Sequence, residues 1–305
     1  METTRHGDRL DLLDAVIYGD AFDCAVTLDE IWRYARIAVG RDDLRRRIEM
    51  DPILSGVVTH RDGLYCLAGR VPLLAERPGR MARARRLQRR ARWIARILRH
   101  LPFVRGLTLT GSVSADDAAG GADIDLLVIV AAGRLGTAFL LLAPLARIFG
   151  GRLFCPNWYL SEDRLDSVSR NLYVARELAQ SMCLWGDADA LLGANPWIRA
   201  VFPNATGPRP MPRESSWAGL QRGLEALLSG AVGRAVEGWP QGVARRRLGA
   251  HYGRFALPVP AAVAEGFEAE SVLGFHGYRY EARILEAHAT GRTRLDIALA
   301  DGSQP

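Results

Sequence analysis

The hydrophobic positions of residues 8–70 first recur at helical spacing and then form two short runs rich in β-branched and aromatic side chains. The apolar positions of the first segment are Leu10, Leu12, Leu13, Val16 and Ile17. A second helix is expected to begin at Thr27, because a threonine followed three residues later by Glu30 has the pattern of a capping box. Residues 41–50 continue the helical spacing, so we expect three short helices before the two runs.

The two runs, residues 56–60 and 64–67, flank Arg61-Asp62-Gly63. Asp-Gly between β-rich runs is a strong signal for a hairpin. Three helices followed by a hairpin predict a winged helix over residues 1–75. Such modules often bind DNA through the third helix, which here carries four arginines that could meet phosphates and three acidic residues that would repel them. DNA binding and a packing or protein-contact role therefore both remain open.

An arginine-rich segment follows the predicted winged helix. Its ten arginines are at positions 77, 80, 83, 85, 86, 89, 90, 92, 96 and 99. Apolar residues lie between them at helical spacing, which predicts an amphipathic helix with a basic outer face. We expect most of these arginines to form a solvated face that joins two domains, although some could reach a triphosphate or a nucleic acid.

Two apolar strands separated by a polar loop are expected next. Residues 107–110 read as the first strand and are followed at once by Gly111-Ser112. The loop is rich in Ala, Gly and Asp; its Asp116 and Asp117 suit solvated turn positions or helix-forming positions better than a metal site. The sequence Asp123-Ile124-Asp125 then opens the second strand, which runs to Val130.

This arrangement predicts a site for a metal ion and a nucleotide. Residues i and i+2 of a strand point to the same side, so Asp123 and Asp125 should present two carboxylates together. Mg²⁺ often binds one or two carboxylates together with substrate phosphates. Gly111 lets a phosphate approach the backbone, and Ser112 adds a hydroxyl and an amide donor at an expected helix start. The expected reaction moves a nucleoside monophosphate from a nucleoside triphosphate to an acceptor and releases pyrophosphate.

The combination of a hydrophobic strand, Gly-Ser, a loop and Asp-x-Asp on a second strand resembles the signature of the DNA polymerase beta-like nucleotidyltransferase superfamily. The resemblance implies that Gly111 and Ser112 bind phosphate and that Asp123 and Asp125 bind the metal. Further segments are similar to bacterial nucleotidyltransferase-domain proteins: residues 101–105, 171–177, 195–198 and 203–204.

The superfamily usually adds a third acidic residue from a later strand. The corresponding strand here is expected over residues 152–160, which contain no carboxylate and carry Asn157 near the expected position. Glu177, Asp163 or Asp187 could substitute, and we favour Glu177 because it should lie on a helix after the core. An ordinary salt bridge with a neighbouring arginine is an equally open role for Glu177. Two carboxylates could also suffice, or the domain could bind a nucleotide without turning it over.

The whole chain is expected to be α+β, with a winged helix over residues 1–75, a mixed-sheet nucleotidyltransferase core over 76–190 and a mainly helical region over 191–305. In the last region, residues 220–232 and 281–288 have helical character and prolines mark a loop over 203–212. No substrate class can be assigned from this region.

Composition narrows the class of protein. The chain has 305 residues, 49% hydrophobic and 24% charged, which suits a folded protein rather than a disordered one. Its net charge is +6 and every basic residue other than histidine is arginine, so anionic partners are plausible. The four cysteines form no CxxC pair, which argues against zinc. Residues 135–149 are too short to span a bilayer, and the polar N-terminus predicts no signal peptide, so we expect a cytoplasmic protein.

Three functions remain open at this point. The first is an active Mg²⁺-dependent nucleotidyltransferase whose acceptor is a small molecule, a protein or a nucleic acid. The second is a catalytically weak or inactive nucleotide-binding regulator whose winged helix binds DNA or protein. The third is an interaction component with a relict site, and the retained pair of aspartates argues against it, because adjacent carboxylates are unfavourable in packing alone.

Overall fold

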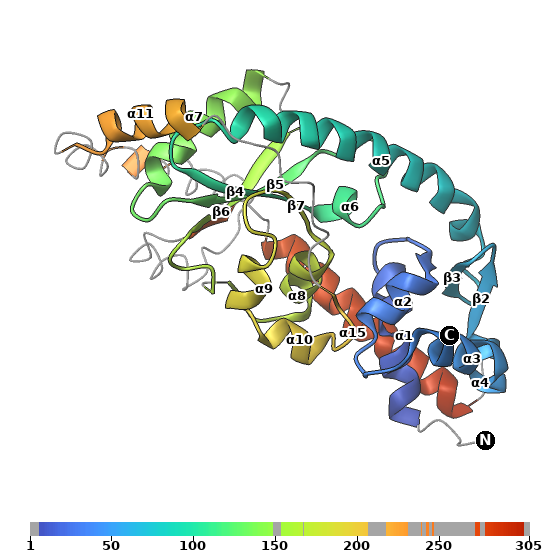
Figure 1. Cartoon of the computed structure of the whole chain (residues 1–305). Helices are drawn as coiled ribbons and strands as arrows, with labels where there is room; N and C mark the ends of the chain where they lie inside the picture. The colour runs from blue at the N-terminus through green and yellow to red at the C-terminus, as the bar shows by residue number, and fades with distance from the viewer. Residues whose placement is uncertain are drawn as a thin grey trace.

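The structure is a computed structural model that describes residues 6–148, 154–166, 168–206, 218–230, 239, 242–243, 246, 272–274 and 278–301. The described part is α+β, with two separate sheets. Figure 1 shows two lobes: an N-terminal lobe around the smaller sheet and a core around the larger one. Two long helices, α5 and α15, run between the lobes on opposite sides of the gap.

The N-terminal lobe contains four helices and a three-stranded antiparallel sheet of order β1-β3-β2. Its elements are α1 (His6–Asp20), β1 (Val26–Thr27), α2 (Leu28–Tyr34), α3 (Arg41–Met50), α4 (Pro52–Val57), β2 (Val58–Arg61) and β3 (Leu64–Leu67). The capping box that starts α2 is present as expected. The strand predicted over residues 56–60 begins only at Val58, so the prediction was wrong for its first two residues. Pro52 at the first helical position and the cap from Asp51 extend a short helix through Val57.

The hairpin between β2 and β3 follows directly from the sequence. Arg61 pairs with Leu64, which leaves Asp62 and Gly63 as a two-residue turn. Both have positive φ, 52° and 75°. A turn that needs left-handed backbone at both central positions favours Asp-Gly, so the predicted hairpin is confirmed, and the structure adds its register.

Helix α5 (Pro72–Leu98) links the lobes and is amphipathic, as the arginine spacing predicts. Ala84, Ala91, Ile94 and Leu98 are buried against the core. The opposite side of the helix is exposed over most of its length. The helix is therefore held in place by its apolar stripe, while most of its arginines face outward and Arg77 is buried.

The core is built on a mixed five-stranded sheet of order β7-β4-β5-β6-β8. Its strands are β4 (Val104–Thr110), β5 (Asp125–Val130), β6 (Cys155–Ser161), β7 (Met182–Trp185) and β8 (Val272–Gly274). Only the β5–β6 pair is parallel; the other neighbours are antiparallel. The expected mixed sheet is confirmed, although β5 begins at Asp125, so that Asp123 lies in the loop just before it.

Helices cover both faces of this sheet, which explains why β5 is apolar at nearly every position. Leu126, Val128 and Val130 pack on one side with α5 and α7 (Leu135–Ile148). Leu127 and Ile129 pack on the other side with α8 (Leu172–Gln180), α9 (Ala190–Ala194) and α10 (Trp197–Val201). Within the described ranges, no helix combines the length and hydrophobicity that a membrane crossing requires.

The C-terminal helix α15 (Tyr278–Asp301) connects the core back to the N-terminal lobe. Leu295, Ala298 and Leu299 join the hydrophobic core of that lobe, and Arg292 donates to the buried Asp14 of α1 over 2.8 Å. Helix α11 (Ala218–Leu228) lies against the other end of the core, where Gln221 donates to the carbonyl of Val104. Much of the proline-rich loop expected over residues 203–212 falls outside the described residues. The helices expected over 220–232 and 281–288 correspond to α11, which ends at Leu228, and to part of α15.

Candidate functional site

The turn after β4 is shaped by Gly111. Its φ is +69°, and a Cβ built on it would lie 2.4 Å from Oδ2 of Asp125. The backbone conformation and the close approach both require glycine here. Ser112 follows in α6 (Gly111–Ser114), which is only a single turn of helix. The sequence pair Gly-Ser therefore sits directly against the first residue of β5.

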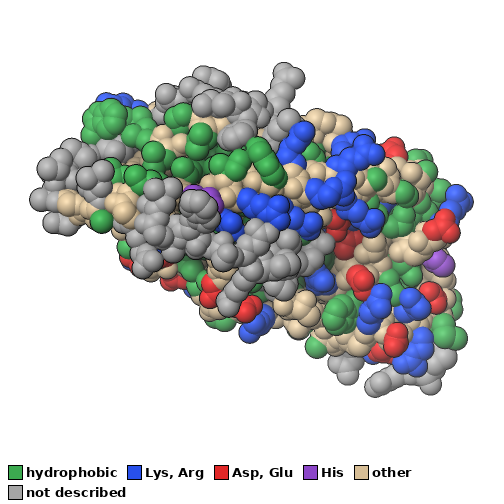
Figure 2. Space-filling view, turned by 45° about the horizontal axis from the view of Figure 1, so that its top comes forward, with side chains coloured by type: hydrophobic (Ala, Val, Ile, Leu, Met, Phe, Trp, Pro, Cys, Tyr) green, Lys and Arg blue, Asp and Glu red, His purple; other side chains and the backbone are tan. Residues whose placement is uncertain are grey.

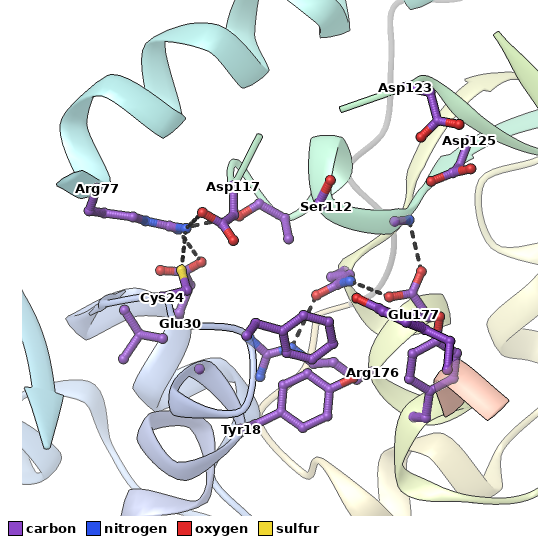
Figure 3. Close-up of a pocket in the computed structure, with 18 residues that line it drawn as sticks. Tyr18, Cys24, Glu30, Arg77, Ser112, Asp117, Asp123, Asp125, Arg176 and Glu177 are labelled. Atoms are coloured by element: carbon purple, nitrogen blue, oxygen red, sulfur yellow. Dashed lines mark hydrogen bonds and ion pairs between the residues drawn. The ribbon is translucent and has the colours of Figure 1, made fainter. Parts of the chain in front are cut away.

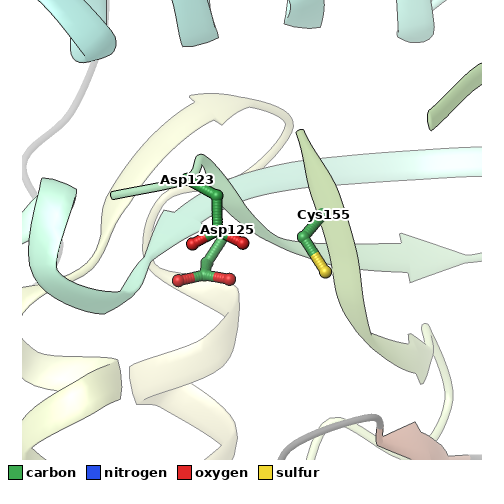
Figure 4. A group of neighbouring side chains, drawn as sticks. All are labelled: Asp123, Asp125 and Cys155. Atoms are coloured by element: carbon green, nitrogen blue, oxygen red, sulfur yellow. The ribbon is translucent and has the colours of Figure 1, made fainter. Parts of the chain in front are cut away.

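Three possible metal ligands come together beside this turn. Asp123 and Asp125 present their carboxylates together, as the spacing of two residues predicts, and Cys155 of β6 is the cross-strand partner of Asp125. One ligand atom from each of the three lies within 4.8 Å of the others (Figure 4). Two hard oxygen donors and one soft sulfur donor therefore surround one point.

The electrostatics of this group disfavour the charged forms. The pKa of Asp125 is raised well above its ordinary value by burial, then by Asp123 and then by Glu177. Burial also raises the pKa of the Cys155 thiol to about 12, with smaller contributions from Asp125 and Asp123. Neighbouring carboxylates oppose each other's ionisation unless a cation is present. These residues therefore fit a divalent ion chemically.

Sequence reasoning missed Cys155 and looked two residues further on, to Asn157. The parallel register places Cys155 opposite Asp125, while the side chain of Asn157 lies outside the described part of the structure. A cysteine is not an expected Mg²⁺ ligand, so residue type gave no signal. Its position at the start of a strand that pairs in parallel with the Asp-x-Asp strand could have given one.

Glu177 is brought to the site by α8, the helix that was expected after the core. Its Oε2 accepts a hydrogen bond from the backbone N–H of Gly111 over 2.8 Å, and its Oε1 accepts one from Nε2 of Gln180 over 2.8 Å. Burial raises the pKa of Glu177 to about 7, although the Gly111 N–H, Arg176 and Gln180 oppose this. Oε2 thus holds the glycine turn in place, and Gln180 of the same helix fixes the other carboxylate oxygen.

The other two candidate acids lie away from this arrangement. Asp163 accepts a hydrogen bond from the hydroxyl of Ser161, and Asp187 accepts from the backbone N–H of Asp189 over 2.9 Å. Neither lines the cavity described below. Of the three acids considered from the sequence, the structure brings only Glu177 to Gly111.

Arg176 does not pair with Glu177 among the described residues. Its guanidinium lies over the ring of Tyr34, 3.4 Å from the centroid, and over Tyr18 at 5.1 Å. It also donates to Oε1 of Gln180 over 3.1 Å. A chain of contacts therefore runs from the tyrosines of the N-terminal lobe through Arg176, Gln180 and Glu177 to the glycine turn.

The site opens into a cavity of about 350 Å³ between the two lobes (Figure 3). The glycine turn, the aspartates and Glu177 form its core side. The N-terminal lobe adds Tyr18, Phe22 and Glu30, while α5 and α15 add Arg77 and Tyr280. Carboxylates and the glycine turn thus line the core side of the cavity, and the rings of Tyr18 and Phe22 line the side of the N-terminal lobe.

Arg77 closes one wall through a buried ionic cluster. It is 1% exposed and donates to Oε1 of Glu30 over 2.7 Å and to Sγ of Cys24 over 2.8 Å. It also lies 3.2 Å from Oδ1 of Asp117, which accepts from Arg80 over 2.7 Å through Oδ2. The expectation that Asp117 is a solvated turn residue is therefore wrong, because its charge is needed to neutralise arginines of α5. Among the described arginines of α5, only Arg77 lines the cavity, and its charge is already matched.

Chemically, the site can place a polyanion beside two carboxylates only if a cation neutralises them. It also offers a tight turn for close approach, a serine hydroxyl and a cavity of about 350 Å³. No family model, curated protein or solved structure matches this chain.

Proposed function

We propose that the protein is a Mg²⁺-dependent nucleotidyltransferase that moves a nucleoside monophosphate from a nucleoside triphosphate to an acceptor and releases pyrophosphate. The observation that carries this proposal is the contact between Gly111 and Asp125 at the mouth of a cavity, with the carboxylate of Asp123 alongside. This is the arrangement that the resemblance to polymerase beta-like nucleotidyltransferases implies. The raised pKa of Asp125 supports a cation site, because a divalent ion would stabilise the ionised pair.

Each residue of the site has a part in this reaction. Asp123 and Asp125 would hold Mg²⁺, which, when bound, neutralises charge on the phosphates. Gly111 lets a phosphate approach the backbone, although its own N–H is already donated to Glu177. The hydroxyl of Ser112 is the nearest remaining donor of the turn that lines the cavity. Glu177, predicted as catalytic, would act by holding the turn, and a role as general base remains a prediction.

The acceptor must fit the same cavity. Ligand cavities commonly measure about 300–1,000 Å³, so a volume of about 350 Å³ lies at the lower end of that range. Both lobes wall it in. We therefore expect the acceptor to be a small molecule or the exposed end of a larger one, and the aromatic side of the cavity is the place where it would bind.

A second function is favoured by the way the N-terminal lobe forms part of the cavity wall. We propose that this lobe, with its helices and final hairpin, is a winged helix. Nucleotide binding would then be sensed by the lobe through Arg77 and Arg176, without turnover. Direct DNA binding by α3 has less support, because Arg41, Arg46 and Arg47 pair with Asp29 or Asp43. An assay of pyrophosphate release in the presence of acceptors distinguishes the two functions, because an enzyme releases pyrophosphate and a regulator without turnover does not.

Calorimetric titration of the four ribonucleoside triphosphates, with and without Mg²⁺, tests the proposal. One nucleotide should bind only with Mg²⁺, and Asp123→Asn plus Asp125→Asn should remove that binding while the fold persists. The matched control is Asp187→Asn plus Asp189→Asn, which removes two exposed aspartates at the same spacing outside the cavity. Equal Mg²⁺-dependent affinity in wild type and the site variant would refute the assignment.

Cys155 makes a separate prediction about metal preference. Soft thiolate ligands select soft ions, so Cd²⁺ should bind beside Asp125 and give an ultraviolet thiolate-to-metal absorption band. Cys155→Ser should lose the band, whereas Cys66→Ser, a buried cysteine of the N-terminal lobe, should keep it. A band that survives Cys155→Ser would show that another thiol binds the ion. That result would leave the role of the aspartates untouched.

A further inference from the structure

The outer face of α5 carries a concentration of positive charge. Its exposed arginines are Arg83, Arg85, Arg86, Arg89, Arg90 and Arg96. No aspartate or glutamate occurs in the helix from Arg77 to its end. Figure 2 shows basic side chains gathered in a band on the face of the molecule that includes α5.

Two groups of arginines can be distinguished along α5. At the N-terminal end, Arg77 and Arg80 are engaged by Glu30 and Asp117, and Arg83 donates to the carbonyl of Ala118. Further along, within the part of the chain that the structure describes, no carboxylate pairs with Arg85, Arg86, Arg89 or Arg90. We call these four residues the α5 basic face.

The α5 basic face has a regular geometry. At about 100° per residue, Arg85 and Arg89 lie on one side of Trp93, and Arg86 and Arg90 lie on the other. Trp93 is 52% exposed. The distance along the helix from Arg85 to Trp93 is about 12 Å at a rise of about 1.5 Å per residue. Seen along the helix axis, the two short rows of guanidinium groups lie on either side of Trp93, which follows them at their C-terminal end.

The platform that carries these groups is fixed. Ala84, Gln88, Ala91 and Ala95 lie on the opposite side of the helix and are buried. Gln88 donates to the carbonyl of Val113 over 2.9 Å, which ties the helix to the loop after β4. The basic face therefore keeps its shape when a partner binds, and little conformational entropy beyond that of the side chains is lost.

We propose that the α5 basic face binds the backbone of a single-stranded nucleic acid. Guanidinium groups match phosphates with paired donors, and an exposed ring beside them gives a base a surface on which to stack. A membrane surface fits less well, because the apolar stripe of α5 is buried and only Trp93 and Ile97 are exposed apolar side chains of its second half. The proposal does not depend on the nucleotidyltransferase activity.

Fluorescence anisotropy with labelled oligouridine RNA and oligothymidine DNA tests this proposal, using the full chain. The first variant replaces Arg85, Arg86, Arg89 and Arg90 with glutamine, which is a good helix former. The matched control replaces the four arginines of α3, at positions 41, 45, 46 and 47, and changes the net charge equally. If circular dichroism shows that the fourfold variant does not fold, the double variant Arg89→Gln plus Arg90→Gln takes its place in the binding assay.

Wild type should bind an oligomer at low salt, and the fourfold α5 variant should bind at least roughly 10-fold more weakly than the α3 control. Four lost phosphate contacts should also reduce the slope of log affinity against log salt by about 3. Preference for the RNA or the DNA oligomer would indicate whether the natural partner is RNA or DNA. No binding by wild type, or equal losses in both fourfold variants, would overturn the proposal. Arginine-dependent binding to phosphatidylglycerol vesicles with none to the oligomers would also overturn it in favour of a membrane surface.

Discussion

Gly111→Ala is expected to remove Mg²⁺-dependent nucleotide binding almost completely, by roughly 100-fold or more, which is about 2.8 kcal/mol. Two effects combine at this position. An added Cβ would lie 2.4 Å from Oδ2 of Asp125, so the carboxylate or the turn must move. The φ of +69° also disfavours any side chain, by about 1–2 kcal/mol. The change thus displaces a metal ligand and the phosphate-binding turn together.

Gly133→Ala is the matched control for this prediction. Gly133 has a φ of +68°, and nothing lies within 4 Å of a Cβ built on it. This substitution should therefore lower stability by the backbone strain alone and leave nucleotide affinity near that of wild type. Calorimetric titration and thermal unfolding of both variants make the comparison. Similar nucleotide affinities in the two variants would show that the contact between Gly111 and Asp125 is not part of the binding site.

Replacing Glu177 with glutamine should change how stability depends on pH. The pKa of this carboxyl is about 7 in the folded protein and 4.5 in the reference state. Between these values the unfolded chain has released the proton and the folded protein has kept it, so wild-type stability falls as pH rises. The interval is 7 − 4.5 = 2.5 pH units, which corresponds to about 3 kcal/mol. Below pH 4.5 and above pH 7 this contribution is constant.

Urea unfolding of wild type and Glu177→Gln between pH 4.5 and pH 7.5, in EDTA, measures the difference. The variant should gain stability relative to wild type as pH rises, by roughly 3 kcal/mol across the interval. At pH 4.5 the free energy of unfolding of the variant will already differ from that of wild type, because the amide can accept only one of the two hydrogen bonds that Glu177 accepts. Glu76→Gln, an exposed carboxylate on α5, is the control. A difference between wild type and Glu177→Gln that does not change with pH would contradict the buried, protonated state of Glu177.

Without a cation, the charged form of this site is unfavourable in the folded protein. Burial and mutual repulsion oppose ionisation of Asp125, and Glu177 adds to that repulsion. A divalent ion that binds only the folded state would stabilise the protein by an amount that grows with the logarithm of its concentration divided by its Kd. We therefore expect nucleotide and metal to stabilise the protein together, in keeping with the general finding that functional sites are locally strained.

Local chemistry let the sequence determine several features by itself. The capping box fixed the start of α2, and Asp-Gly fixed the hairpin and its register, because both signals depend on backbone conformations within a few residues. Asp123 and Asp125 do lie together as the sequence predicts, although Asp123 precedes β5 rather than lying in it. The predicted start of β2 was wrong for a local reason too. Asp51 and Pro52 start a short helix, and the prediction did not take this signal into account.

Only the tertiary structure decided how the site is completed. Cys155 lies beside Asp125 because two strands pair in parallel, and their register depends on the packing of helices on both faces of the sheet. Glu177 reaches Gly111 across 66 residues of sequence, and Arg77 reaches Glu30 across 47. Such contacts form because charged groups that become buried must lie next to a partner of opposite charge or a hydrogen-bond partner. Residue type and spacing along the chain carry no information about that, because burial is a property of the assembled lobes.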